Sequence, residues 1–382
     1  MRIAVIGAGA AGLLFSLLIK GRFPAWKVET FEQNPEGATY GFGVVFSDGA
    51  LMFLERDEPE LSRTIEAAME RWPMQRLVHR DERVEVDGNG FSAISRLALQ
   101  EVLQGLCRRA GVTIRHGRPI SSLEELAGAD LVVGADGSNS LVRNALAAQF
   151  VPNVEVLTNR FAWYGTAQPF DCLTLTFRGS EHGDFVAHHY RHSPSMSTFV
   201  VECGEATWRK AGLDRMSDAE SQAYCEGVFA ADLGGYALAS NKSVWRQFPL
   251  VRNERWTARC SPSAHAVLLG DALRTVHFSI GSGTRLAFED AIALDRAFAE
   301  CGDDVPRALA AFERERRPVV EKLLAAANAS SYWYEKLSEK MKLEPWRLAY
   351  DYMTRSGRMN DERLRALAPK FMARVDAERG RG

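Results

Sequence analysis

Three glycines near the N-terminus have the types and spacing of a dinucleotide-binding turn. Gly7, Gly9 and Gly12 directly follow the apolar run Arg2–Ile6 and open a helix-forming segment. In this arrangement the N–H groups at the helix start face a pyrophosphate, and a carboxylate after the next strand binds an adenosine ribose. Glu32 ends a second predicted strand and fills that position. The predicted dinucleotide-binding residues are Gly7, Gly9, Ala10, Ala11, Gly12, Glu32 and Gln33.

Two later segments repeat the pattern of a buried strand that ends in glycine and aspartate. One ends at Asp136-Gly137 and the other at Gly270-Asp271. The carboxyl ends of strands in an open α/β sheet share one ligand crevice, so we expect both segments to meet the N-terminal turn around one cofactor. An aspartate there could hold a ribityl hydroxyl, and N–H groups of the next loop could contact a flavin ring edge. This FAD-binding prediction covers Asp136, Gly137, Gly270, Asp271, Gly281, Ser282, Gly283 and Thr284.

Two further segments are candidates for the flavin end of the same site. Tyr40–Asp48 carries two glycines among aromatic residues, which favours backbone that lies against something flat, and we include Val44 and Val45 as cofactor-binding residues. Arg96 opens a predicted helix, where its charge opposes the helix dipole, so we expect an anionic partner. The alternatives are a turn that enters a helix near Gly49–Glu55 and an exposed surface arginine.

The composition is that of an ordinary globular chain and argues against several classes of partner. Of the 382 residues, 46% are hydrophobic and 25% are charged, and the formal net charge is −2. This balance gives no electrostatic footprint for nucleic acid or an anionic membrane, and no apolar run approaches the roughly 20 residues of a membrane span. The 6 cysteines stand singly, so we expect no metal site, no disulfide framework and a cytoplasmic location.

The order of the predicted elements indicates an α/β protein with an inserted sheet. Strands and helices alternate up to residue 150, consecutive strands follow, and helices dominate after Thr284. We predict a Rossmann-like FAD-binding fold with an inserted antiparallel-sheet substrate domain and C-terminal helices. The predicted FAD-binding domain comprises residues 1–75, 90–150 and 255–320, the β-rich substrate domain 76–89 and 151–254, and the C-terminal helical segment 321–382.

Turn and cap residues predict the finer boundaries. A helix is expected over Pro59–Arg71, followed by a strand over Leu77–Val86 that ends in a hairpin turn at Asp87–Gly90. Asp303-Asp304 is expected to cap a later helix, and Pro318 is expected to break one.

With these motifs the chain resembles the group A flavoprotein aromatic monooxygenases, the p-hydroxybenzoate hydroxylase-like class. The marks are the N-terminal glycine turn, Arg96-x-x-Leu99, Asp136-Gly137 with Arg143, and Gly270-Asp271, and the resemblance covers nearly the whole chain. It implies that Arg96 contacts FAD, that Asp136-Gly137 serves FAD and NAD(P)H, and that Asp271 binds the ribityl region. It also implies tight, non-covalent FAD, with NAD(P)H and O₂ as co-substrates.

One departure from the usual pattern narrows this resemblance. Where that class has a histidine after Gly-Asp-Ala-Ala and then a proline pair, this chain has Arg274 and His277–Thr284. With Tyr40–Asp48, Glu181–Gly183 and Ser197–Glu202, it resembles the branch of salicyloyl-CoA 5-hydroxylase and 2-aminobenzoyl-CoA monooxygenase. The resemblance implies hydroxylation of a ring that bears a hydroxyl or amino group, on an aryl-CoA thioester such as salicyloyl-CoA at the 5-position.

The candidate catalytic residue is His277, which directly precedes the predicted flavin loop. A neutral imidazole there could engage a phenol or aniline proton near pH 7, and a purely structural histidine is the alternative. His188 and His189 alternate on one predicted strand, so at most one can line a pocket, and Tyr190 shares the face of His188. Phe278 and Tyr164, with Trp163, could form an aromatic wall or pack in the sheet core. The predicted substrate residues are Tyr164, His188, Tyr190, His277 and Phe278.

Alternative functions stay open at this point. The violacein-pathway tryptophan hydroxylase shares much of the same pattern, so a free aromatic or indole substrate such as tryptophan is one alternative, and a non-catalytic flavin-binding protein is another. A flavin halogenase is disfavoured, because none of the 8 tryptophans lies in a Trp-x-Trp-x-Ile-Pro segment. No reductase-like domain follows Gly382, so we expect a stand-alone hydroxylase. The helices after Val319 could cap the FAD-binding domain or form the face of a homodimer.

Overall fold

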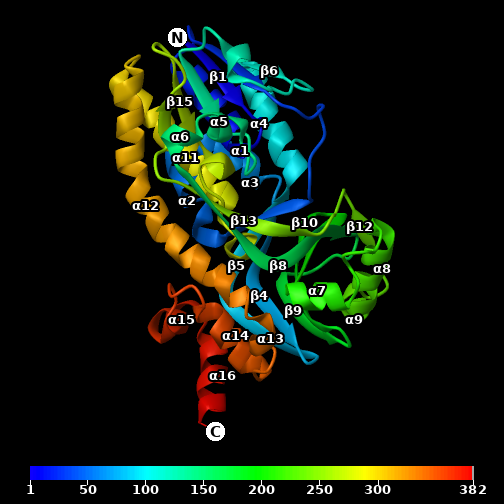
Figure 1. Cartoon of the computed structure of the whole chain (residues 1–382). Coiled ribbons are helices and arrows are strands. Elements are labelled where there is room, and N and C mark those ends of the chain that lie inside the picture. The colour runs from blue at the N-terminus through cyan, green and yellow to red at the C-terminus, as the bar shows by residue number, and fades with distance from the viewer. Residues whose placement is uncertain (381–382) are drawn as a thin grey trace.

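The smaller of two sheets contains the strands predicted around the glycine turn (Figure 1). A computed structural model describes residues 1–380, and within that range this sheet consists of β1 (Arg2–Ile6), β2 (Lys27–Phe31), β6 (Thr113–Arg115), β7 (Leu131–Gly134), β14 (Thr257–Arg259) and β15 (His265–Leu268). Their order is β14-β15-β7-β1-β2-β6, with β14 antiparallel to β15 and the other neighbours parallel. The predicted α/β, Rossmann-like arrangement is confirmed.

The larger sheet lies below the first in Figure 1 and is mostly antiparallel. Its order is β12-β8-β11-β10-β9-β4-β5-β3, with β13 also paired to β8, and β4 runs parallel to β9. The strands that the described residues contribute are β3 (Gly43–Ser47), β4 (Glu70–His79), β5 (Glu82–Ser95), β8 (Pro152–Thr166), β9 (Leu173–Ser180), β10 (Gly183–Ser193), β11 (Met196–Cys203), β12 (Leu238–Ser240) and β13 (Arg246–Asn253).

The hairpin of β4 and β5 differs from its prediction. The turn lies at Arg80 and Asp81, whose φ angles are 49° and 62°, and Asp87–Gly90 lies inside β5. A Cβ on Gly88 would stand 2.0 Å from the carbonyl oxygen of Leu367, so this glycine permits a close approach to the C-terminal helices rather than a turn. The preceding helix also ends early, at Glu66, because β4 begins four residues later. Both strands continue through the predicted domain boundaries at residues 75/76 and 89/90.

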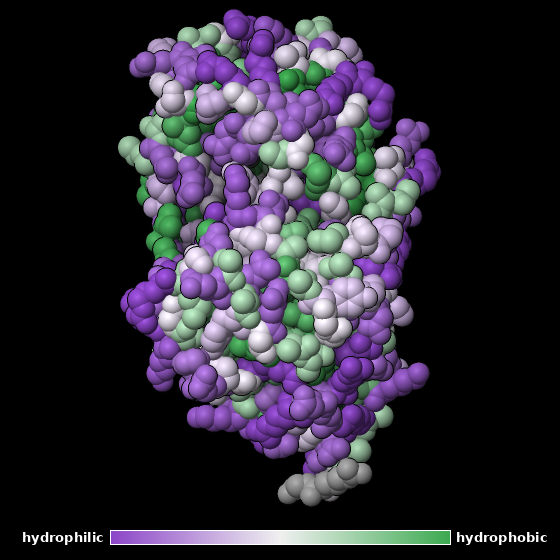
Figure 2. Space-filling view, turned by 90° about the vertical axis from the view of Figure 1, so that its right-hand side faces the viewer, coloured by the Kyte–Doolittle hydropathy of each residue, from purple (hydrophilic) through white to green (hydrophobic). Residues whose placement is uncertain are grey.

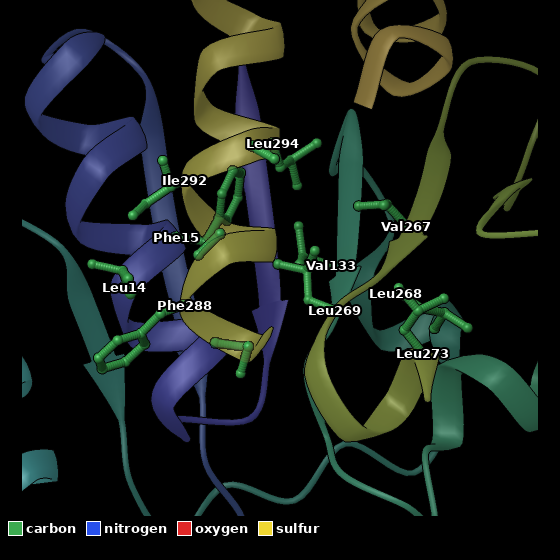
Figure 3. Close-up of a cluster of buried hydrophobic side chains, with 14 of the residues drawn as sticks. Leu14, Phe15, Val133, Val267, Leu268, Leu269, Leu273, Phe288, Ile292 and Leu294 are labelled. Carbon is green, nitrogen blue, oxygen red and sulfur yellow. The ribbon is translucent and has the colours of Figure 1, made fainter. Parts of the chain in front are cut away.

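Two helices pack together against the smaller sheet and hold its strand ends. Helix α1 (Ala10–Arg22) contributes Leu14 and Phe15, and α11 (Gly283–Cys301) contributes Phe288 and Ile292, all of them buried. Figure 3 shows them in one buried cluster with Val133 of β7, Leu268 at the end of β15 and Leu269 after it. This core is the fixed support for everything at the carboxyl edge of the sheet.

A 30-residue helix connects the two ends of the molecule. Helix α12 (Val305–Tyr334) runs from the smaller sheet to the C-terminal helices (Figure 1). Asp304 caps it by accepting a hydrogen bond from Arg307 N at 3.2 Å, which confirms the predicted cap. The predicted break at Pro318 is wrong: this proline lies inside the helix. Proline removes one backbone hydrogen bond, but the helix is buried on both sides of it, at Phe312 and Val320, and this packing keeps the helix continuous.

The last helices pack on the larger sheet. Tyr352 and Met372 from this region form a buried cluster with Leu77, Val84 and Phe177 of β4, β5 and β9. These helices therefore cover the larger sheet and not the FAD-binding domain as predicted, and the homodimer face stays a prediction. Among residues 1–380 no helix is both long and apolar enough to cross a membrane. The other helices are α2 (Met52–Asp57), α3 (Pro59–Glu66), α4 (Arg96–Ala110), α5 (Leu141–Ala145), α6 (Ala147–Phe150), α7 (Glu205–Lys210), α8 (Asp218–Val228), α9 (Ala230–Leu233), α10 (Gly270–Leu273), α13 (Leu337–Lys340), α14 (Pro345–Thr354), α15 (Asp361–Leu367) and α16 (Pro369–Arg379).

Candidate active site

The ends of four strands lie in one row, as the three separated motifs predict. Ala135 N donates to Ile6 O and Leu269 N donates to Gly134 O, each at 2.8 Å, and Gly7 N donates to Phe31 O at 2.7 Å. A cavity of about 560 Å³ opens along this row. Of the predicted cofactor-binding residues it is lined by Gly7, Gly9, Ala10, Ala11, Glu32, Gln33, Val44, Val45, Arg96, Asp136, Gly137, Gly270, Asp271, Gly281, Ser282, Gly283 and Thr284.

The three glycines of the first turn have different roles. Gly12 is the one predicted cofactor-binding residue that does not line the cavity. Gly7 has φ +101°, and a Cβ on it would stand 2.3 Å from Ala135 O; a Cβ on Gly12 would stand 2.1 Å from Gly7 O. Both positions are closed by neighbouring backbone. Gly9 has nothing within 4 Å of its Cβ position, so this backbone is open to a ligand. Helix α1 begins there without a side-chain cap or an acidic residue in its first turn, which leaves its N–H groups for an anion.

Glu32 marks the adenosine end of the cavity. Its carboxylate accepts hydrogen bonds from Ala8 N at 2.9 Å and from the N and Nδ2 atoms of Asn34 at 2.9 and 2.7 Å. These bonds tie the glycine turn to the segment after β2. A neighbouring part of the wall is formed by Arg118, Pro119 and Ile120, none of which belongs to a predicted motif. They follow β6, which pairs with β2, so the rule that strand ends share a crevice could have found them.

Asp136 and Arg143 fix the second motif. Asp136 Oδ2 accepts from Leu141 N at 2.7 Å, at the start of α5, while Oδ1 is buried and has no hydrogen-bond partner among the described residues. Burial raises the pKa of Asp136, and hydrogen bonds from Ser140 and the α5 backbone oppose the shift. Arg143 donates to Ser138 O at 2.5 Å and to Ala272 O at 3.2 Å, so it links this loop to α10.

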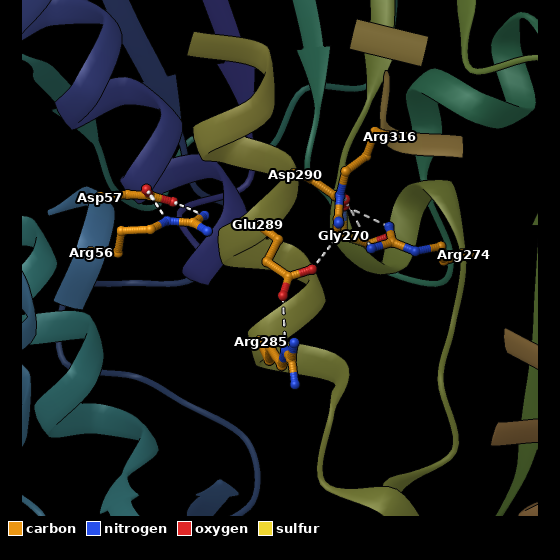
Figure 4. Close-up of polar contacts among 8 residues, drawn as sticks. All are labelled: Arg56, Asp57, Gly270, Arg274, Arg285, Glu289, Asp290 and Arg316. Carbon is orange, nitrogen blue, oxygen red and sulfur yellow. Dashed lines mark hydrogen bonds and ion pairs between the residues drawn. The ribbon is translucent and has the colours of Figure 1, made fainter. Parts of the chain in front are cut away.

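Arg274 lies where the chain departs from the family pattern. Its ion pair with Asp290 holds α10 in place. Its guanidinium lies 2.5 Å from Asp290, and both side chains are at most 2% exposed. Asp290 also accepts from Gly270 N at 3.2 Å and from Arg316 at 3.0 Å, and Arg316 contacts Glu289 (Figure 4). This buried ionic network therefore sets the position of the Gly270-Asp271 turn, which lines the cavity.

Arg96 and Asp271 both line the cavity, and the charge of each affects the pKa of the other. Burial raises the pKa of Asp271, and the charges of Arg96 and Arg274 oppose that shift. Burial lowers the pKa of Arg96, and Asp271 opposes this. Arg96 forms no ion pair within residues 1–380, and its guanidinium lies 5.4 Å from the centre of the Trp163 ring. The expected anionic partner is present as a long-range charge and not as a direct contact.

Strand β3 packs closely against other strands of the larger sheet and against the loop that begins at Gly281. A Cβ on Gly43 would stand 2.5 Å from His192, and Gly43 N donates to Thr198 Oγ1 at 2.9 Å. Gly281, with φ +57°, lies so close to Val45 that an added Cβ would stand 3.2 Å from its Cγ1. Strand β3 and the loop that begins at Gly281 thus form one wall of the cavity.

Four aromatic residues form the end of the cavity next to the larger sheet, which we call the aromatic end. They are Trp163 of β8, Tyr190 of β10, Phe248 of β13 and Phe278, with Val44, Val45 and Val276 beside them. The Tyr190 hydroxyl donates to Gly43 O at 3.0 Å, and burial raises its pKa to about 12. Tyr190 therefore stays neutral and its proton is already engaged.

Comparison with known proteins agrees with this geometry. The family model described as "FAD binding domain" matches residues 121–327. Salicyloyl-CoA 5-hydroxylase of a Streptomyces species is 39% identical, covering 93% of this chain and 70% of that protein. Protodeoxyviolaceinate monooxygenase of Chromobacterium violaceum is 38% identical, covering 90% and 91%. The 3-hydroxy-4-methyl-anthranilyl-(aryl-carrier protein) 5-monooxygenase of Streptosporangium sibiricum is 34% identical, covering 94% and 95%.

This chain belongs to the FAD-dependent aromatic monooxygenases. The resemblance seen in the sequence motifs is thereby confirmed, as is FAD as the cofactor of the family, with NAD(P)H as co-substrate. A structure of 2-methyl-3-hydroxypyridine-5-carboxylic acid oxygenase has a TM-score of 0.67 at 18% identity and covers 96% of this chain and 95% of its own. At that identity the likeness shows the fold alone.

The cavity of the monooxygenase fits FAD on the evidence of its own atoms. The open space at Gly9 and the uncapped start of α1 suit a pyrophosphate, and the buried, unpartnered Asp136 Oδ1 lacks only a donor. Glu32 could hold the adenosine ribose, Asp271 the ribityl chain and the loop from Gly281 the ring edge. FAD, when bound, supplies the redox chemistry, and the protein supplies position and electrostatics.

The structure places three of the predicted substrate residues away from the cavity wall of the monooxygenase. Tyr164 is on the opposite face of β8 from Trp163, where its hydroxyl meets Ser221 at 3.3 Å in the core under α8. His188 and His277 lie behind Phe278, with ring centres 5.4 and 4.2 Å from it. Only Tyr190 and Phe278 of the predicted set line the aromatic end, and Trp163 and Phe248 join them.

Behind Phe278 lies a buried polar cluster. His188 Nε2 is 3.7 Å from Glu202 Oε2, and Asn159 donates to Glu202 Oε1 at 2.8 Å. Burial alone would raise the pKa of Glu202, but its contacts with His188, His277 and Asn159 outweigh burial and lower it. Burial lowers the pKa of His277 to about 4, so this imidazole is neutral near pH 7. Its Nδ1 accepts from Ser279 N at 3.3 Å, which caps the turn that carries Phe278.

Proposed function

We propose that this monooxygenase hydroxylates the ring of an aryl-CoA thioester, with salicyloyl-CoA at the 5-position as the first candidate. The observation that carries the proposal is the composition of the aromatic end. Its walls are aromatic and aliphatic, and Arg96, whose charge is coupled to Asp271, is the one cation among the described residues there. A free carboxylate buried at this end would have no dedicated partner, whereas a thioester is neutral.

The proposed roles of the chain's residues follow from their positions. Trp163, Phe248 and Phe278 would hold the ring by its faces and exclude water from it. Arg96 would favour developing negative charge near the flavin end, because it is cationic and poorly solvated. His277 would act as a positioning residue for Phe278 rather than as an acid or base, since it lies behind the wall.

Two of the three relatives named above support a tethered ring. One is named for a CoA ester and another for an aryl-carrier protein, and both names describe 5-hydroxylation or 5-monooxygenation. A ring joined through a thioester has no free carboxylate. This matches an aromatic end with no spare cation among the described residues that line it.

A second candidate is a free indole-type substrate. It is favoured by the relative named protodeoxyviolaceinate monooxygenase, which matches over nearly its whole length. A large fused ring would also suit a flat aromatic wall. This candidate requires a neutral or exposed acid group, because the described residues that line the aromatic end include no second cation.

Substrate-stimulated oxidation of NAD(P)H by the FAD-loaded enzyme tests the proposal. Salicyloyl-CoA, 2-aminobenzoyl-CoA, salicylate, 2-aminobenzoate and tryptophan would be compared, with mass spectrometry to find a product that gains one oxygen. We expect the CoA esters to stimulate oxidation and to yield 5-hydroxylated product, and the free acids to do neither. Turnover of tryptophan or of a free acid in preference to its CoA ester would refute the proposal.

A further inference from the structure

Two exposed cations lie in the segment that leads into β13, next to elements that line the cavity, and take part in no ion pair within residues 1–380. Lys242 lies in the loop between β12 and β13, and Arg246 is the first residue of β13. Neither belongs to the FAD-binding row of strand ends. Neighbouring residues fix the position of each cation.

Lys242 is held at the mouth of the cavity by its neighbour. The Asn241 side chain donates to the carbonyls of Thr39 and Gly41 at 3.0 and 3.1 Å, so this loop is fastened to the segment before β3. Lys242 has φ +56°, in the left-handed region that residues other than glycine rarely adopt. Its ammonium lies 5.3 Å from the centre of the Tyr40 ring, and Tyr40 lines the cavity.

Arg246 leaves β13 on the face that carries the aromatic end. It pairs directly opposite Phe161 of β8, and opposed residues of an antiparallel pair point to the same face. The Phe161 ring lies 5.0 Å from Phe278 and 6.3 Å from Phe248, which both line the cavity. Lys242 therefore lies beside the cavity wall at Tyr40, and Arg246 lies on the sheet face that carries the aromatic end.

We propose that Lys242 and Arg246 bind the phosphate groups of coenzyme A while the acyl ring lies in the aromatic end, an inference that rests on the aryl-CoA substrate proposed above. Lysine and arginine are the usual partners of phosphate, and the pantetheine arm provides a long flexible link from ring to phosphates. Arg246 has no structural partner within residues 1–380, and Lys242 has only its contact with the Tyr40 ring, so a phosphate can recruit both cations without breaking an ion pair.

Coenzyme A suits this surface better than a carrier protein. Figure 2 views the side on which β12 lies in Figure 1, and there hydrophobic residues occur in small groups between hydrophilic ones. A protein partner needs an interface of about 800 Å² on each side, usually with an apolar centre. A short chain of phosphates needs only a few cations.

Binding of coenzyme A itself tests the site without turnover. Calorimetric titration would compare the FAD-loaded wild type with Lys242→Gln, Arg246→Gln and the double variant, and with Arg252→Gln as the matched control, an exposed arginine at the other end of the same strand. We expect Kd to rise about three- to tenfold for each single variant and further for the double variant, with a strong dependence on salt and no change for the control. Wild type that does not bind coenzyme A, or variants that bind it equally well, would overturn the proposal.

A second measurement separates this site from the proposed function. KM would be compared for salicyloyl-CoA and for the salicyl thioester of N-acetylcysteamine, which carries no phosphate. The site predicts that the double variant raises KM only for the CoA ester and leaves kcat unchanged. If neither thioester is turned over while coenzyme A binding still depends on both cations, the substrate proposal fails and the site stands. If both thioesters are turned over and the variants change neither KM nor coenzyme A binding, the site fails and the substrate proposal stands. Turnover only of a ring on a carrier protein, with no affinity for coenzyme A, would replace coenzyme A as the occupant.

Discussion

The two ends of the cavity are built from different material. At the dinucleotide end the chain presents backbone: strand ends in one row, the open position at Gly9 and the uncapped start of α1. At the aromatic end it presents side chains, among them Trp163 and Phe248, from strands that are far apart in sequence. Backbone geometry sets the class of cofactor, because it depends on the fold. Side chains set the ring that fits, because they can change while the fold stays the same.

The largest effects should come from adding one methyl group at the dinucleotide end. Gly12→Ala puts a Cβ at 2.1 Å from Gly7 O, so the turn must open, and we expect loss of FAD together with a lower melting temperature. Gly9→Ala meets nothing within 4 Å, so it should keep its melting temperature without FAD but lose at least tenfold in FAD affinity. Flavin absorbance of the purified variants and thermal unfolding of the apoprotein measure both. Equal behaviour of the two variants would contradict the separate roles of the two glycines.

The next largest effect concerns the support of α10. Arg274→Met leaves Asp290 buried with one cation fewer, and we expect a loss of about 3 kcal/mol in the free energy of unfolding, with weaker FAD binding because the Gly270-Asp271 turn shifts. Arg209→Met is the control, because its ion pair with Glu205 is exposed and lies outside this network, so its loss should change stability little. Urea titration of both variants decides the matter. If they lose equal stability, the network does not support the turn.

Most of the dinucleotide end could be predicted from the sequence because its signals are local. Each motif, such as Asp136-Gly137, ends an apolar run, and the rule for strand ends brings such motifs together. The missed wall at Arg118–Ile120 has no glycine or aspartate to draw attention to it. The hairpin was misplaced because glycines at Asp87–Gly90 resemble a turn, whereas Gly88 makes room for the C-terminal helices.

The aromatic end could be predicted only in part, because alternation along a strand does not say which face is inward. Tyr190 was correctly grouped with His188 on one face of β10, but depth along the strand decides that Tyr190 reaches the cavity and His188 lies behind Phe278. On β8, Tyr164 is among the predicted substrate residues, but its neighbour Trp163 on the opposite face lines the cavity. Phe248 carried no signal in the sequence, since its place depends on the pairing of β13 with β8.

At the aromatic end, one truncation should weaken substrate binding and leave FAD binding unchanged. Phe248→Ala removes a ring from the cavity wall, and we expect KM for the aromatic substrate to rise about ten- to hundredfold, with FAD content unchanged. Tyr164→Phe is the control: its hydroxyl faces Ser221 on the other side of β8, so KM should not change. Steady-state kinetics with the best substrate found would show this. Loss of FAD in the Phe248 variant would mean that the two ends are not separable.

The smallest effect is the pH dependence that His277 contributes from behind the aromatic end. Burial lowers the pKa of His277 from 6.5 to about 4, so between these values the unfolded chain binds a proton that the folded chain does not. Stability contributed by the neutral imidazole is therefore complete above pH 6.5 and is lost as the pH falls toward 4, by about 1 kcal/mol at pH 5.5. His277→Gln should lose less stability than wild type between pH 7.5 and 5.5, as measured by urea unfolding at both values, and kcat at pH 7.5 should change little if this residue only positions Phe278. A variant that instead abolished turnover while keeping FAD and stability would return His277 to the catalytic role, and would mean that the wall formed by Phe278 opens during the reaction.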